Sequence, residues 1–260
     1  MVTARDRPAT GGVGYHGPRC CGVGCAGRKG GWNWSSGCAA ISPGSSGPSR
    51  RRSCARRGGS TWPAITIAGR RRPDRLLRAV SRTLGATFTL PIDAETRPPE
   101  RWAHYFQGVL RVLAARQPLP GGADLLVDAD LPPGGGLSSS SALVVGFGKL
   151  LAQLYGLPLD ARALALLGCD AEHWYGTTGG IMDHFVIGHA RPGHALLLDC
   201  RSLAHTDIPI PPGVAIVVAD TRTRHDQLTS PFAQRRRETE AGLAVIRARH
   251  PAVRTLRDVD

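Results

Sequence analysis

The 260-residue sequence predicts an α/β (α+β) fold. Beyond about residue 84, short apolar runs typical of strands alternate with segments whose apolar residues recur at helical spacing. Charge divides the chain at the same place. Residues 1–83 hold 16 Lys and Arg against 2 Asp and Glu, whereas residues 84–260 hold 17 against 18. The formal net charge of +13 therefore belongs to the first third, and the remainder has the balance of an ordinary folded domain.

Residues 1–83 show neither helical nor strand periodicity. Glycine, proline, serine and arginine dominate there, as in SPGSSGPSRRRSCARRGG at residues 42–59. Such a composition buries too little apolar surface to offset its chain entropy, so we expect an irregular segment. Translation out of frame would explain its composition. Its arginines raise the alternative of a nucleic-acid binder, but it has few aromatic residues and no recognisable binding module, so we expect no nucleic-acid partner.

Two features bear on the compartment. Cys169 and Cys200 are the only cysteines beyond residue 83, which fits a reducing cytosol. No run of about 18 apolar residues occurs, so we expect no transmembrane helix and a cytoplasmic protein that binds no membrane.

The first predicted elements follow in order from residue 102. A helix is expected over Trp102–Leu113, and the apolar run Ala123–Ala129 after a Gly-Gly break is expected to be a strand. A second helix is predicted over about 139–154. A third begins after Asp160, a plausible N-cap, and reaches about Tyr175.

The last predicted elements are two strands and a helix. The apolar runs His194–Asp199 and Val214–Ala219 are expected to be buried strands, and a helix is expected over about Pro231–Arg249.

The segment Leu131–Ala142, LPPGGGLSSSSA, lies between the first predicted strand and the second predicted helix. Glycines let a backbone approach a ligand closely, and a helix N-terminus offers unpaired N–H groups. The segment therefore favours a polyphosphate site, although a flexible Gly/Ser linker remains the alternative. No Lys-Ser or Lys-Thr follows the glycines, so this is not a Walker P-loop.

Two carboxylates are the other candidate site residues. Asp183, in GGIMDHF, is placed to accept a hydroxyl proton, or it is simply a first-turn helix acid. Glu172 is a candidate Mg²⁺ ligand, or a solvated surface residue. The histidines, including His173 and His184, lack zinc-site spacing, and we take them as non-ligands.

Together these segments resemble the GHMP kinase superfamily, and within it the galactokinases. The glycine-serine loop is similar to the family's P-x-G-x-G-L-S-S-S-A motif, and AEHWYGTTGGIMDHF is similar to the block A-E-H…C-G-I-M-D-Q-F. HALLLDCRSL and RHDQLTSPFAQRRRE resemble the two segments that follow. The four motifs keep the family's order over roughly residues 97–249.

The resemblance implies ATP and Mg²⁺ as cofactors and galactose or a related sugar as substrate. Ser140 and Glu172 would hold the metal, Asp183 would be the catalytic base, and Phe232 would contact the sugar where the family has Tyr. The remaining implied residues contact the ATP phosphates: Pro133, Gly134, Gly135, Gly136, Leu137, Ser138, Ser139, Ser140 and Ser141.

The sequence also departs from the family pattern. The opening G-R-V-N-L-I-G-E-H-T-D-Y block and the closing G-x-G-F-G-G motif are absent, Ser141 replaces Ala, and His184 replaces Gln. The expectation is a two-lobed GHMP-kinase-like fold with an incomplete N-terminal lobe and a truncated C-terminal lobe. Residues 84–210 would be the ATP-binding domain and residues 211–260 the start of the second.

The expected function is an ATP-dependent sugar 1-kinase of galactokinase type, in truncated or impaired form. The alternative is a non-catalytic galactokinase-like sensor or regulator.

Overall fold

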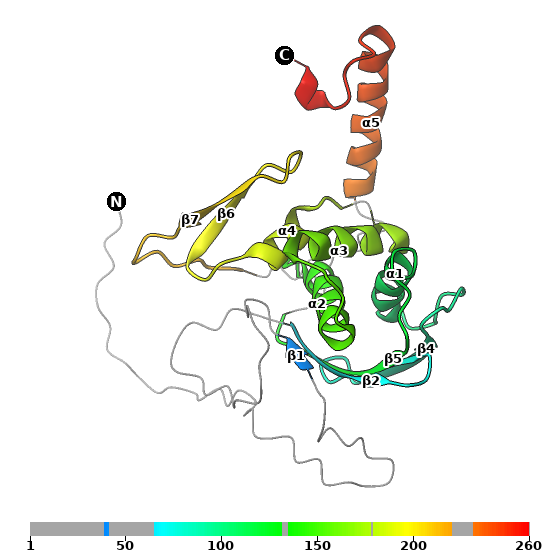
Figure 1. Ribbon diagram of the computed structural model, residues 1–260. Coiled ribbons are helices and arrows are strands. Elements are labelled where there is room, and N and C mark those ends of the chain that lie inside the picture. The colour runs from blue at the N-terminus through cyan, green and yellow to red at the C-terminus, as the bar shows by residue number, and fades with distance from the viewer. Residues whose placement is uncertain (1–38, 42–64, 132–134, 178, 220–230, 260) are drawn as a thin grey trace.

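The computed structural model describes residues 39–41, 65–131, 135–177, 179–219 and 231–259 (Figure 1). Its main body is a curved five-stranded sheet with helices packed over one face. A separate two-stranded hairpin and a long helix extend from this body. Within the described residues, no helix combines the length and apolar character needed to cross a membrane. The mixed α/β class that the sequence predicts is confirmed.

The large sheet has the strand order β1-β2-β5-β3-β4. The central strand β5 runs antiparallel to β2 and parallel to β3, and β3 forms an antiparallel hairpin with β4. Gly85 closes that hairpin at a φ of +60°, a conformation that costs glycine little. The strands are β1 (Ala39–Ile41), β2 (Ile65–Arg72), β3 (Leu76–Ser81), β4 (Ala86–Pro91) and β5 (Gly122–Ala129).

Four helices complete this body, and three of the four, together with β5, confirm elements predicted from the sequence. The side chain of Asp160 accepts a 2.7 Å hydrogen bond from the Ala163 N–H, so its predicted capping role is also confirmed. The short helix that carries Asp183 was not among the predicted elements, but the alternative that Asp183 is a first-turn helix acid agrees with its position. The helices are α1 (Ala103–Ala114), α2 (Ser139–Tyr155), α3 (Ala161–Tyr175) and α4 (Met182–His189).

The core lies between the sheet and these helices. Ile65, Ile67 and Gly69 alternate along β2 toward the helices. On the helix side, Phe106 of α1 packs against Phe147 of α2, with ring centroids 4.8 Å apart. Buried residues recur every second position on the strands and about every 3.6 positions on the helices. This pattern is typical of a sheet with helices packed on one face.

The expectation that residues 1–83 are irregular is wrong for residues 65–83, which form β2 and β3. The misleading signal was charge, because six of the 16 basic residues of the first third lie in this stretch. Arg70 and Arg72 lie on the sheet face opposite the core and bind Asp124 of β5, at 2.9 and 2.8 Å. Asp124 is only 1% exposed, so these arginines neutralise a buried acid inside the sheet. The other residues of the first third, except β1, lie outside the described residues.

The two strands predicted near residues 194 and 214 fare differently. The first is present as β6 (His194–Leu198), paired with β7 (His205–Pro209), but it is not buried, since Leu197 is 66% exposed. Val214–Ala219 forms no strand, and Val217 is 87% exposed. The run has strand-like composition, but a strand also needs a hydrogen-bonded neighbour. The described part of the chain places none beside it.

The predicted last helix is present as α5 (Pro231–Arg249), followed by a 3₁₀ turn at Leu256–Asp258. Ion pairs of Arg201 with Asp258 (2.6 Å) and of Arg257 with Asp199 (2.5 Å) join that turn to the β6–β7 hairpin. The Thr255 backbone N–H and the Arg201 guanidinium lower the pKa of Asp258 to about 2. The turn and the hairpin thus hold each other through paired charges.

The contact between α1 and α3 leads to a stability prediction. A Cβ added at Gly108 would lie 2.5 Å from the Ala171 carbonyl oxygen, a backbone atom that cannot rotate away. We expect Gly108→Ala to lower the free energy of unfolding by about 1–3 kcal/mol, measured by urea denaturation. Gly242→Ala on α5 is the matched control, because nothing lies within 4 Å of its added Cβ. A Gly108→Ala variant as stable as the control would contradict this close packing.

Candidate active site

The glycine-serine loop ends in an unusual helix start. Gly136 has a φ of +76°, and Ser138, at the N-cap of α2, has a φ of +55°. Left-handed backbone is costly for a serine and often marks a functional site. The Ser138 side chain makes no capping hydrogen bond, so it leaves the first N–H groups of α2 uncovered. Unpaired N–H groups and the positive end of the helix dipole suit an anion such as phosphate.

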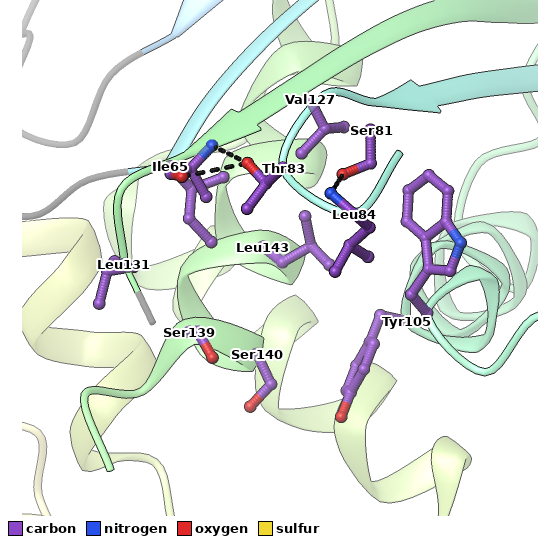
Figure 2. A pocket seen from close by; sticks show the side chains of 12 residues that line it. Ile65, Ser81, Thr83, Leu84, Tyr105, Val127, Leu131, Ser139, Ser140 and Leu143 are labelled. Carbon is purple, nitrogen blue, oxygen red and sulfur yellow. Dashed lines mark hydrogen bonds between the residues drawn. The ribbon is translucent and has the colours of Figure 1, made fainter. Parts of the chain in front are cut away.

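A cavity of about 200 Å³ lies beside this helix start (Figure 2). Ser139 and Ser140 lie along one side of it, and Tyr105 approaches from α1. The lining is largely apolar, with a few hydroxyl groups, as is typical of small-molecule sites. The twelve lining residues are Ile65, Ser81, Thr83, Leu84, Trp102, Tyr105, Val127, Ala129, Leu131, Ser139, Ser140 and Leu143.

The turn between β3 and β4 forms another side of the cavity and is tied to its neighbours. The Thr83 hydroxyl donates to the Ala129 carbonyl at 3.0 Å and accepts from the Ala129 N–H at 2.7 Å (Figure 2). The Leu84 N–H donates to the Ser81 hydroxyl at 3.1 Å. These bonds hold Leu84, which is half exposed, at the cavity.

A second group of polar residues is buried where α2, α3 and α4 meet. Glu172 of α3 is 3% exposed, so the alternative of a solvated surface residue is wrong. Its Oε1 accepts a 3.1 Å hydrogen bond from the Ser141 hydroxyl and lies 3.6 Å from His184 Nε2. Burial raises the pKa of Glu172, but His184, Ser140 and Ser141 together outweigh burial, and the net shift is downward. Glu172 is therefore a buried, ionised carboxylate.

The structure brings some of the predicted site residues together. Ser140 acts on Glu172 and also lines the cavity, so the expected metal pair is adjacent. Asp183 lies half-buried in the first turn of α4, one residue before His184. It is not among the residues that line the cavity, and its role as base stays a prediction. Pro133 and Gly134 lie outside the described residues, as does the side chain of Phe232.

Sequence reasoning missed the aromatic part of the site. The sequence used Trp102 and Tyr105 only to predict a helix, whereas both are half-buried and line the cavity. Both rings also pack against the core. The ring centroid of Trp102 lies 4.6 Å from that of Phe88, and the ring centroid of Tyr105 lies 4.8 Å from that of Tyr175. One signal in the sequence could have revealed this. Two large aromatic residues lie three positions apart at the very start of a helix, and the Trp N–H and the Tyr O–H would each need a hydrogen-bond partner in a closed core.

The lowered pKa of Glu172 predicts a pH dependence of stability. The ordinary pKa of the carboxyl is 4.5, and its pKa in the folded protein is lower, so its contribution to stability is complete above about pH 4.5. That contribution is lost as the pH falls through the folded pKa. We expect Glu172→Gln to lower the free energy of unfolding at pH 7 by about 1–3 kcal/mol and to lose less stability than wild type on acidification. Urea denaturation between pH 7 and pH 3 measures this, with Glu240→Gln on exposed α5 as control. Parallel pH curves for Glu172→Gln and wild type would contradict the shift.

Residues 104–191 match the family described as GHMP kinases N terminal domain. The chain is 40% identical over 198 residues to a galactokinase of Chloroflexus aggregans, and 37% identical over 197 residues to one of Roseiflexus sp. strain RS-1. Each match covers 75% of this chain, and the relatives are covered over 51% and 50% of their lengths. The chain thus spans about half the length of the curated relatives it matches.

A solved structure agrees with these sequence matches. The galactokinase of Lactococcus lactis, complexed with galactose, superposes with a TM-score of 0.66 at 25% identity. The superposition covers 75% of this chain and 52% of that one. In both sequence and fold, the chain is galactokinase-like over three quarters of its length, and residues 104–191 match the N-terminal domain of the GHMP kinases.

Proposed function

We propose that this chain belongs to an ATP-dependent sugar 1-kinase of galactokinase type, which transfers the γ-phosphate of ATP to galactose or a related sugar. The observation that carries the proposal is the cavity beside the start of α2, with the buried carboxylate of Glu172 next to it. The similarity to galactokinases supports the choice of sugar. Residues 84–210, extended to residue 65 by β2 and β3, would be the ATP-binding domain, and residues 211–260 the start of a second domain.

The cavity suits the nucleoside of ATP. Aromatic rings from Trp102 and Tyr105 and the aliphatic Leu84 offer flat apolar surface for a base. Base–aromatic stacking contributes about 1–3 kcal/mol per base. The hydroxyls of Ser139 and Ser140 lie in the same cavity and mark the direction in which the phosphates would extend.

The phosphates would bind at the start of α2. The N–H groups of that first turn are not capped by the Ser138 side chain, and two glycines, Gly135 and Gly136, come shortly before it. The implied phosphate contacts, Gly135 to Ser141, lie within or next to this turn. Positioning and charge neutralisation are the main requirements of phosphoryl transfer, and a helix N-terminus supplies both.

The oxygen ligands available next to the phosphates suit Mg²⁺. Ser140 contributes a hydroxyl and Glu172 an ionised carboxylate, and hard oxygen ligands are what Mg²⁺ prefers. Within the described residues, no cluster of three or more His, Cys, Asp or Glu could hold a metal alone. Mg²⁺ usually takes only one or two protein ligands and completes its shell with phosphates and water. When bound, it would neutralise charge on the transferred phosphoryl group.

Asp183 is the proposed base for the sugar hydroxyl, and Phe232 is proposed to contact the sugar. Support for this role of Asp183 comes from α4, which packs on α2 and α3. The next residue of α4, His184, lies 3.6 Å from Glu172, the proposed metal ligand.

A cytoplasmic location is part of the same proposal. Its support is that Cys169 and Cys200 are both free thiols.

The aromatic wall leads to a binding prediction. We expect Trp102→Leu to weaken ATP binding roughly 5- to 150-fold, because Leu keeps apolar bulk but loses the stacking surface. Isothermal titration calorimetry on the purified chain measures the Kd. Trp174→Leu is the matched control, a half-buried tryptophan that packs against Arg97 and does not line the cavity. Equal ATP affinity in the two variants would place the base elsewhere.

The proposed base leads to a prediction on turnover. We expect galactose-dependent ATP consumption to fall on the order of 10²–10⁴-fold in Asp183→Asn, since Asn cannot accept the hydroxyl proton. A coupled assay with and without galactose measures it. Asp207→Asn in β7 serves as control for loss of a half-exposed carboxylate. Turnover that persists in Asp183→Asn would reject Asp183 as base. Nucleotide binding without turnover in wild type would instead favour the sensor or regulator.

A further inference from the structure

The serines at the start of α2 divide between two environments. Ser139 and Ser140 are half-exposed and line the cavity, whereas Ser141 is 3% exposed and faces Glu172. Successive helical residues point about 100° apart, so one short run serves the cavity and the buried carboxylate at once. Ser141 therefore has a task distinct from that of its neighbours.

Ser141 and His184 reach the same oxygen of Glu172. The Ser141 hydroxyl donates to Oε1 at 3.1 Å, and His184 Nε2 lies 3.6 Å from Oε1. Neither contact involves Oε2. A carboxylate held through one oxygen by residues from two other helices has a fixed orientation, and its second oxygen is presented in a fixed direction.

The fold makes specific room for His184. A Cβ on Gly168, one turn before Glu172 on α3, would lie 3.0 Å from His184 Cδ2 and 2.9 Å from Val145 Cγ2. His184 is 2% exposed, and within the described chain neither ring nitrogen has a hydrogen-bond partner. Burying an imidazole costs free energy unless its nitrogens interact with something polar, and the acid within ion-pair distance is Glu172.

We propose that Ser141 and His184 are positioning residues that hold Oε1 of Glu172 and so present Oε2 to the divalent cation of the nucleotide. This inference rests on the proposed function. It separates Ser140, as the cavity-side metal ligand, from Ser141, whose hydroxyl acts only through Glu172. Removing a residue that orients a metal ligand typically costs about 10- to 100-fold in metal affinity.

The test measures how much Mg²⁺ strengthens ADP binding. Isothermal titration calorimetry on the full chain, with ADP alone and with ADP plus Mg²⁺, gives the ratio of the two Kd values. We expect Ser141→Ala, which removes the buried hydroxyl but keeps the backbone N–H of Ser141, to reduce that ratio about 10-fold. His184→Leu is expected to reduce it similarly, and His184→Gln to restore much of it, because the Gln amide N–H can donate to Oε1.

Ser202→Ala is the matched control, since the Ser202 hydroxyl donates to the Asp199 carboxylate at 2.7 Å in the distant hairpin. An unchanged Mg²⁺ effect in Ser141→Ala would overturn the proposal. So would equal weakening of ADP binding with and without Mg²⁺, which marks a structural role alone.

The failure of the proposed function would look different. Wild type would then bind ADP no better with Mg²⁺ than without it. A crystal structure of Ser141→Ala decides the positioning claim in that case. A Glu172 carboxylate that keeps its orientation rejects positioning, and a rotated carboxylate supports it independently of the metal.

Discussion

The arrangement of the helices depends on keeping one negative charge inside the protein. Glu172 is 3% exposed, and an isolated buried carboxylate would be protonated or would unfold its surroundings. It stays ionised because α2 supplies Ser140 and Ser141, and α4 supplies His184. Three helices are thereby fixed relative to one another at a polar point, beneath the cavity-lining start of α2. Apolar packing alone tolerates small slides between helices, whereas a 3.1 Å hydrogen bond to a charged oxygen does not.

The sequence predicted the helices over this core well, because their apolar spacing and caps are local signals. It failed where the deciding information was long-range. Arg70 and Arg72 made β2 look like part of a basic, irregular segment, yet both bind Asp124, more than 50 residues away. For Val214–Ala219 the error was the reverse, because a strand was predicted and none forms. An apolar run becomes a strand only when a neighbouring strand is available for pairing. Local composition indicates which secondary structure a segment favours, but whether a strand forms depends on pairing with a strand that is distant in the sequence.

The candidate site was predictable in the same uneven way. The glycine-serine loop and the start of α2 were predictable because glycines allow a close approach of the backbone and a helix start offers free N–H groups. Glu172 and Asp183 were candidates from their residue types, and their roles came from the resemblance. The burial of Glu172 could not be predicted, because a lone glutamate on a helix is usually solvated. Nor could the different tasks of Ser140 and Ser141 be told apart, since only the helical phase relative to α3 and α4 separates them. Trp102 and Tyr105 served only to predict a helix, because residues that line a cavity and residues that fill a core have the same apolar spacing.

The strand order of the large sheet has a consequence for how the chain folds. Residues 73–75 alone separate β2 from β3, yet the two are not neighbours, because β5 is inserted between them. No early hairpin of β2 and β3 can therefore form and persist. Ile65 must wait for Ala129 as its partner, so the loop that the pairing of β2 with β5 closes is long, and its closure is entropically costly. Folding rates fall with such sequence separation, and we expect folding on the slow, millisecond-to-second side for a domain of this size. On the ribosome, one edge of β2 stays unpaired until β5 has emerged, and the apolar face of β2 stays uncovered until α2 follows. A chaperone would matter most in this interval.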